Sequence, residues 1–132
     1  MTTLLKKSRD YIDLDLSFSK HPVTNNVSIK REKSSVKQSI VHLMTLKEGD
    51  KPFHPEIKSP IYHYLFETSS NIVQIVLADE VRQYLSVYEP RVNIKHVSIS
   101  YPNPNTLGCE IFGEIINISE PFTVNILIDR LR

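Results

Sequence analysis

The spacing of the apolar residues changes at Pro90 from a helical period to an alternating one. Between Asn71 and Tyr88 the apolar side chains recur at intervals of three and four, which is typical of one buried helical face. In residues 122–128 every second side chain is apolar, which indicates a strand with one buried face. Because proline cannot continue a helix, the chain must change structure here. The pattern predicts an α+β protein in which the sheet is C-terminal.

The helical part is predicted to span residues 31–88. Ser35 is the expected N-cap of its first helix, because Gln38 stands three residues later, where a capping box places its second member. Gly49 is expected to end this helix. The next twelve residues, GDKPFHPEIKSP, contain three prolines, so this loop is predicted to be stiff. One interpretation of Phe53 is that it anchors the loop in the core.

Two shorter segments complete this half of the chain. Residues 1–30 are polar and are predicted to form an irregular N-terminal arm, with short candidate strands at residues 14–18 and 27–29. Ser59, which is followed by a proline, has the pattern of an N-cap before the first residue of a helix. A short helix is therefore predicted over residues 61–67.

Residues 92–130 are predicted to form a β meander. Its three candidate strands are residues 97–101, 109–118 and 122–128, separated by short connections rich in turn residues. Sequential strands with short connections pair in an antiparallel manner, and the helices are expected to pack on one face of this sheet. A chain of 132 residues fits one domain, so residues 1–132 are predicted to form a single unit.

Composition argues against several classes of protein. The net charge of +1 gives no general attraction to nucleic acid or to an anionic membrane. No apolar run approaches the ~20 residues that a membrane span requires. The lone Cys109 cannot form an intramolecular disulfide, and the N-terminus carries charges where a signal peptide needs an apolar stretch. We therefore expect a soluble protein that is made and assembled inside a cell, without nucleic acid or a membrane as partner.

The sequence gives little support for a metal site or a phosphate-binding loop. The five histidines and Cys109 never approach the spacing of metal ligands, so no metal site and no cofactor are predicted. Three glycines leave little from which to build a phosphate-binding loop. Cys109 lies in a predicted strand and is interpreted as a small buried hydrophobic residue rather than a nucleophile. A basic cluster could meet phosphates or an acidic protein, but without interleaved aromatic residues it is interpreted as a solvated helix start. This cluster consists of Lys30, Arg31, Lys33 and Lys37.

Glycoside hydrolysis is the enzymatic alternative. It needs two carboxyl groups, one of which is held protonated as a general acid. The candidate residues are Glu67, Glu80, Glu89, Glu110 and Glu114. Arg91 lies two residues from Glu89, and a neighbouring cation favours the ionised carboxylate, which is the wrong form for a general acid. No catalytic residue is therefore predicted.

The Glu-Pro-Arg sequence of residues 89–91 allows two interpretations. It could be a helix terminator with a surface ion pair worth roughly 0–1 kcal/mol. It could instead be a stiff docking point, in which the planar fork of Arg91 binds a carboxylate or a carbonyl of another protein. In the second case Arg91→Ala should leave the domain folded and block assembly. The residues alone leave both possibilities open.

Two motifs carry a resemblance to a known family. The loop GDKPFHPE is followed by Leu65–Glu67, by the long helix and by the Glu-Pro-Arg turn, in an order and spacing that resemble the baseplate wedge proteins of contractile-tail bacteriophages. That family is often labelled lysozyme-like and has relatives in contractile secretion machines. The resemblance covers roughly residues 10–130, and Lys58 stands where the family commonly has glycine. The matching loop residues are Gly49, Pro52, Phe53, Pro55 and Glu56.

The resemblance implies a structural virion protein of the inner baseplate, without enzymatic activity, that is assembled in the host bacterial cytoplasm. Its implied partners are the other wedge proteins, through their core bundle, and the tail sheath protein, with tail tube or hub proteins as further candidates. The family's docking motif falls on Glu89, Pro90 and Arg91. The C-terminal sheet is implied to resemble the interlocking domain of the sheath subunit and to start sheath assembly. The strand expected to contact the sheath contains Phe122, Val124, Asn125, Ile126 and Ile128.

Overall fold

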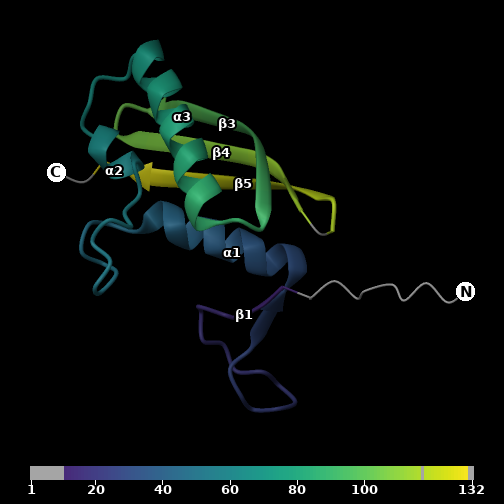
Figure 1. Ribbon diagram of the computed structural model, residues 1–132. Helices are drawn as coiled ribbons and strands as arrows, with labels where there is room; N and C mark the ends of the chain where they lie inside the picture. Colours follow the sequence, from purple (N-terminus) through teal and green to yellow (C-terminus); the bar gives the residue numbers. More distant parts are fainter. Residues whose placement is uncertain (1–10, 117, 131–132) are drawn as a thin grey trace, which may run out of the picture.

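The structure is a computed structural model that describes residues 11–116 and 118–130. In this part of the chain, helices and a sheet form a body from which a hairpin projects as an arm (Figure 1). The helices are α1 (Glu32–Thr45), α2 (Ile61–Tyr64) and α3 (Asn71–Tyr88). The arm contains β1 (Ile12–Leu14) and β2 (Ile29–Arg31), and the sheet contains β3 (Val92–Asn103), β4 (Thr106–Ile115) and β5 (Glu120–Asp129). The α+β prediction with a C-terminal antiparallel sheet is confirmed.

The sheet is a meander in the order β3-β4-β5, so β5 is an edge strand. Helix α3 crosses the sheet over β3, and α1 runs along β5 (Figure 1). The inward face of β5 is the predicted one, and its residues Phe122, Val124, Ile126 and Ile128 are all buried. The residues between them, Thr123, Asn125 and Leu127, are exposed. The phase of this strand is therefore confirmed.

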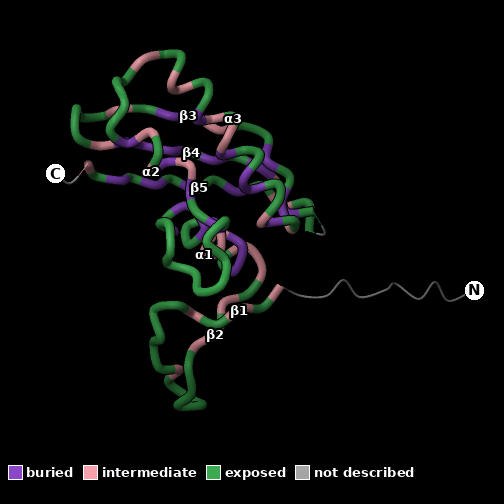
Figure 2. Tube along the Cα trace, turned by 60° about the vertical axis from the view of Figure 1, so that its left-hand side comes forward, coloured by how far each residue is buried: buried purple, intermediate pink, exposed green. Residues whose placement is uncertain are grey.

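The core lies between the helices and the inward face of the sheet (Figure 2). Helix α1 contributes fully buried residues at the spacing that the sequence shows, as does α3. The fully buried residues of these two helices include Val36, Ile40, Met44, Leu77, Val81 and Leu85. Burying an aliphatic side chain of this size contributes about 1.5–3 kcal/mol. A hydrogen bond of 2.8 Å from the Tyr84 hydroxyl to the Leu43 carbonyl also joins α3 to α1.

The prediction of Ser35 as the N-cap of α1 is wrong, because the N-cap is Arg31 and the helix begins at Glu32. Ser35 is buried within the helix, and its hydroxyl donates a hydrogen bond to Asp13 in the arm (2.5 Å). The side chain of Gln38 also binds the arm, where it accepts from the Leu16 N–H (3.0 Å) and donates to a carbonyl. The two residues of the expected capping box thus bind the arm instead of capping the helix. The helix ends at Thr45, before Gly49, and the buried Leu46 that follows is extended.

The observed bounds of the other elements match the predicted bounds only in part. Helix α3 has the predicted bounds, and its N-cap Ser70 accepts a hydrogen bond from the Val73 N–H (3.3 Å). Helix α2 ends at Tyr64 rather than at residue 67. Strand β3 begins five residues before the predicted start, because a β-bulge between Ile94 and His96 breaks the alternation on which the prediction depended.

The arm is more regular than predicted within its described residues. Strands β1 and β2 pair in an antiparallel manner, and Lys20 and Val27 form a further bridge nearer the tip. Strand β1 starts two residues before the predicted range and ends at Leu14, and β2 is shifted two residues toward the C-terminus. The arm is mostly exposed (Figure 2), and Figure 1 shows it projecting from the side of α1 that faces away from the sheet.

Candidate functional site

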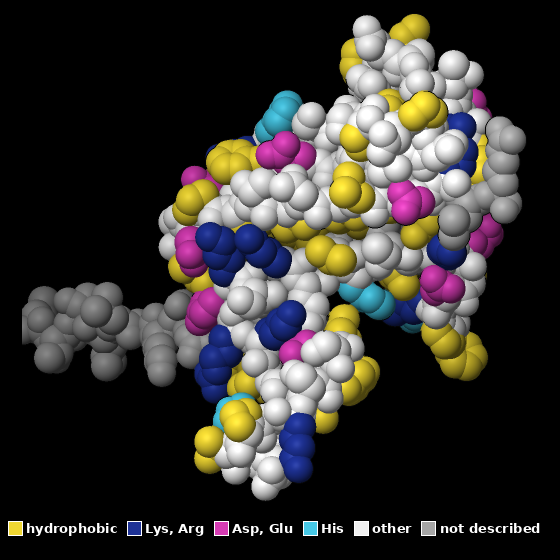
Figure 3. Space-filling view, turned by 180° about the vertical axis from the view of Figure 1, so that it is seen from behind, with side chains coloured by type: hydrophobic (Ala, Val, Ile, Leu, Met, Phe, Trp, Pro, Cys, Tyr) yellow, Lys and Arg dark blue, Asp and Glu magenta, His cyan; other side chains and the backbone are white. Residues whose placement is uncertain are grey.

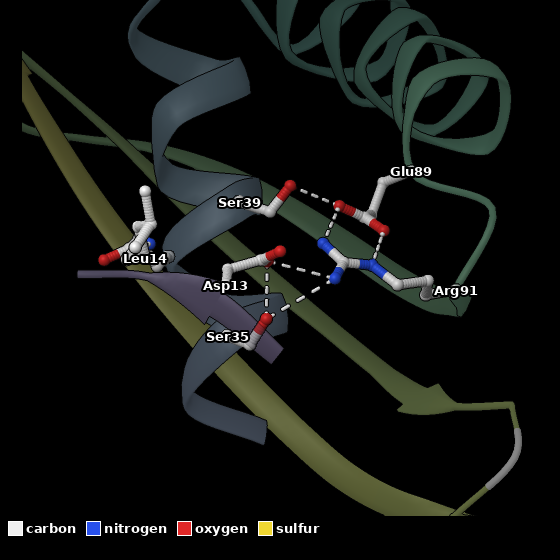
Figure 4. Close-up of polar contacts among 7 residues, drawn as sticks. Asp13, Leu14, Ser35, Ser39, Glu89 and Arg91 are labelled. Atoms are coloured by element: carbon white, nitrogen blue, oxygen red, sulfur yellow. Dashed lines mark hydrogen bonds and ion pairs between the residues drawn. The ribbon is translucent and has the colours of Figure 1, made fainter. Parts of the chain in front are cut away.

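The Glu-Pro-Arg turn points its two charged side chains toward α1 (Figure 4). Helix α3 ends at Tyr88, and the Glu89 N–H completes it by donating to the Leu85 carbonyl (2.8 Å). Pro90 has no N–H with which to continue the helix. Glu89 is only 2% exposed, so the turn does not simply present its charges to solvent.

Arg91 binds Glu89 through a bidentate ion pair. Arg91 Nε lies 2.6 Å from Glu89 Oε1, and Nη2 lies 2.9 Å from Oε2. Glu89 Oε2 also accepts a hydrogen bond from the Ser39 hydroxyl of α1. The carboxylate of Glu89 is buried, so the interpretation of the turn as a surface ion pair is wrong. A buried charge depends on its partners, which are Arg91 and Ser39 here.

The same arginine holds the arm. Its Nη1 lies 3.1 Å from Asp13 Oδ2 in β1 and 3.4 Å from Ser35 Oγ in α1. The hydrogen bond from Ser35 and the neighbouring guanidinium lower the pKa of Asp13, while the two carboxylates raise the pKa of Arg91. Asp13, Ser35, Ser39, Glu89 and Arg91 are called the Arg91 cluster below. It joins the end of α3, one face of α1 and the base of the arm (Figure 4).

Only two members of this cluster, Glu89 and Arg91, are marked by a sequence motif. Ser35 has the pattern of a helix cap, and no motif marks Ser39 or Asp13. Ser35 and Ser39 are four residues apart beside the apolar positions of α1, and this pair of small polar residues on a buried face was the available signal. The docking role of Glu89, Pro90 and Arg91 stays a prediction. The structure adds that the side chains of Glu89 and Arg91 form hydrogen bonds and ion pairs within the chain.

The open edge of β5 is a second candidate contact. The Arg130 N–H donates to the Asn105 carbonyl of the neighbouring chain segment (2.6 Å), so even-numbered residues of β5 bond toward β4. Odd-numbered residues then direct their backbone groups away from β4. Pro121 belongs to this odd set, where its missing N–H leaves no gap in the ladder. Thr123 and Asn125 therefore present backbone donors and acceptors at the edge of the sheet.

A groove of about 620 Å³ gives access to this edge. Its walls are formed by α1, by the base of the arm and by β5, with Thr123 and Asn125 on one side and Val41 and Lys37 on the other. Two lysines nearby are paired, Lys33 with Glu120 (3.5 Å) and Lys30 with Asp15 (3.8 Å). Figure 3 shows dark-blue Lys and Arg side chains gathered where the arm joins the body. The groove thus combines a basic rim with a strand edge that pairs with no other strand among residues 11–116 and 118–130.

The proline-rich loop does not use Phe53 as an anchor, so that interpretation is wrong. Phe53 is 97% exposed, and the loop is fixed to the core by Leu46 and Ile57, which are 7% and 9% exposed. The remaining motif residues, Gly49, Pro52, Pro55 and Glu56, are also exposed. Gly49 has a φ of +84°, a left-handed conformation that favours glycine.

The candidate catalytic residues do not form a common site. Glu80 accepts a hydrogen bond from the Tyr64 hydroxyl (2.7 Å), and Glu114 lies 3.9 Å from Lys95 in the sheet. Glu67 and Glu110 are exposed. Cys109 is buried, as predicted, and burial raises the pKa of its thiol to about 12, so it is not a thiolate at neutral pH. Among residues 11–116 and 118–130, no group of three or more His, Cys, Asp or Glu side chains could hold a metal ion.

Comparisons with known proteins show a matching family and similar solved structures. The family model described as baseplate wedge protein gp25 matches residues 30–119, which is more than half of the chain. A crystal structure of a candidate tail lysozyme from Geobacter sulfurreducens is similar, with a TM-score of 0.67 and 17% identity over 74% of this chain and 89% of that one. A chain in the cryo-EM structure of the anti-feeding prophage baseplate has a TM-score of 0.62 and 16% identity over 92% of this chain and 86% of that one. The comparison with curated sequences finds no match.

Proposed function

The chain belongs to the baseplate wedge protein gp25 family, and we propose that it is a structural protein of the inner baseplate wedge of a contractile tail. The observation that carries this proposal is the family match over residues 30–119, which includes α1 to α3, the proline-rich loop, the Glu-Pro-Arg turn and two strands of the sheet. The similarity of fold to a chain of the anti-feeding prophage baseplate supports it. None of the described helices is long and apolar enough to cross a membrane.

The proposed role in sheath assembly rests on the edge of β5. An extended segment can add to a sheet where backbone groups are unpaired, and such an edge is otherwise an aggregation hazard. Thr123 and Asn125 offer these groups within a groove. We propose that a segment of the tail sheath protein pairs here, so that the sheet starts the first ring of sheath subunits. Assembly would take place in the host bacterial cytoplasm, before the tail is complete.

The proposed docking role of Glu89, Pro90 and Arg91 takes a specific form. Because Arg91 is bonded to Glu89 and Asp13, it is one of the residues that hold the arm against the body, together with Ser35 and Gln38 of α1. The wedge core bundle would then contact the surface that these residues hold in place, together with the exposed part of Arg91, whose side chain is 22% exposed. Tail tube and hub proteins are further candidate partners.

The alternative function, a peptidoglycan-degrading tail lysozyme, can be excluded by one assay. Purified protein is expected to show no muramidase activity between about pH 4 and pH 8, because a general acid needs an apolar or acidic setting and the buried Glu89 is ion-paired with Arg91. The measurement is turnover of purified peptidoglycan, with an active muramidase as positive control. Turnover that disappears after a single Glu→Gln substitution would show that the chain is an enzyme.

A further inference from the structure

The proline-rich loop between α1 and α2 is fixed at its base and projects into solvent. The Ser59 N–H donates to the Leu46 carbonyl (2.9 Å), which closes the base of the loop. Ile57 packs into the core beside this bond. In Figure 3 the loop forms the projection at the lower right, and hydrophobic side chains cover its end.

A series of turns fixes the shape of the projecting part. The Asp50 carboxylate accepts from the Lys47 N–H (2.9 Å). Farther along, the His54 N–H donates to the Lys51 carbonyl (3.3 Å), and the Ile57 N–H donates to the His54 carbonyl (3.1 Å). Prolines stand on both sides of the tip, and each restricts its own φ and the conformation of the preceding residue. The tip is therefore held in one shape before any partner arrives.

Phe53 occupies this tip in a conformation that costs free energy. Its φ is +65°, a region that residues other than glycine and asparagine seldom adopt. The side chain is 97% exposed, so burial within the chain gives almost nothing in return. Backbone strain at an exposed aromatic residue is a feature of binding sites, where a partner supplies the compensating contact.

We propose that Phe53 is an aromatic anchor that inserts into an apolar pocket of a neighbouring baseplate protein. This inference rests on the proposed function and adds a contact separate from the Arg91 cluster and from the edge of β5. Aromatic residues dominate the binding free energy of protein interfaces, and a preorganised loop loses little conformational entropy when it binds. A loop that presents one rigid ring fits a pocket about the size of that ring.

The charges around the tip favour a protein partner over a membrane. Residues 47–58 contain three lysines and three carboxylates, so their charges cancel when His54 is neutral. Within the loop Lys58 forms an ion pair with Glu48 (3.4 Å), and His54 Nδ1 lies within hydrogen-bond distance of Glu56 Oε1 (3.1 Å). A loop that binds an anionic bilayer would need an excess of basic residues.

Three variants of the full chain test this inference. Phe53→Asn removes the ring and places at the tip a residue that tolerates a positive φ, whereas Phe53→Leu keeps an apolar side chain. Ile72→Asn is the matched control, because Ile72 is an exposed apolar residue (74%) on α3, away from the loop. The probe is a baseplate wedge subassembly purified from tail genes expressed without this chain. Binding is measured by fluorescence anisotropy and stability by thermal unfolding.

The Phe53→Asn chain is expected to unfold at the same temperature as the wild type or higher, while its Kd for the subassembly rises at least about tenfold. Phe53→Leu should recover most of the affinity, and Ile72→Asn should bind like the wild type. Wild-type affinity of Phe53→Asn, or a lower unfolding temperature, would overturn the inference and leave the proposed function standing. Phe53-dependent binding to phosphatidylglycerol vesicles would assign the loop to a membrane instead. A wild-type chain that does not bind the subassembly would overturn both proposals.

Discussion

Arg91→Ala is expected to lower the free energy of unfolding by about 3 kcal/mol, because it leaves a buried carboxylate without its cation. Glu89 is 2% exposed and would keep only the hydrogen bond from Ser39. The arm would lose its ion pair to Asp13 at the same time. Chemical denaturation of the isolated chain measures this change. Baseplate assembly is expected to be impaired as well, because the arm loses one of the contacts that hold it against the body.

Three further variants separate the causes. Arg91→Lys keeps the charge but offers no planar fork, so it should recover only part of the stability. Adding Glu89→Gln to Arg91→Ala removes the unpaired charge and should make the loss smaller than in Arg91→Ala alone. Lys33→Ala breaks an exposed ion pair to Glu120 and should cost no more than about 1 kcal/mol. A change of less than about 0.5 kcal/mol in Arg91→Ala would contradict the bracing role.

Asn125→Pro is expected to leave the isolated chain folded and to prevent sheath growth on finished baseplates. The Asn125 N–H points away from β4, as the position of Pro121 in the same strand indicates, so proline removes no bond of the sheet. It does remove a donor that an added sheath strand would use. Sheath length on baseplates is measured by electron microscopy, and unfolding by circular dichroism.

Two matched variants serve as controls. One tests whether the Asn125 side chain matters, and the other tests whether the direction of the lost N–H matters. Asn125→Ala keeps the backbone N–H and should support normal sheath. Val124→Pro removes an N–H that bonds to β4 and should destabilise the chain itself. Sheath of normal length on Asn125→Pro baseplates would rule out strand addition at this position.

The sequence predicted the elements whose signals are local. The bounds of α3 follow from the spacing of its apolar residues and from Pro90 at its end, and the buried face of β5 follows from its alternation. Both signals come from residues within the element, so contacts with distant segments did not change them. The same is true of Cys109, whose burial follows from its place in a central strand.

The cluster was missed because it depends on contacts between distant parts of the chain. Asp13 and Arg91 are 78 residues apart, and Ser39 and Glu89 are 50 apart, so no local pattern connects them. Without those contacts Ser35 has the pattern of a helix cap. The interpretation of Phe53 as a core anchor fails because the stiff loop holds its side chain in solvent.

The most direct test of the central claim is electron microscopy of tails assembled from the complete set of tail genes with this gene omitted and then restored. We expect that, without the chain, baseplates are incomplete and tail tubes carry no sheath, and that the wild-type gene restores sheathed tails. Density for the body and arm should then appear in the inner baseplate, with a sheath segment beside the edge of β5. Sheathed tails of normal length in the absence of the chain would contradict the claim.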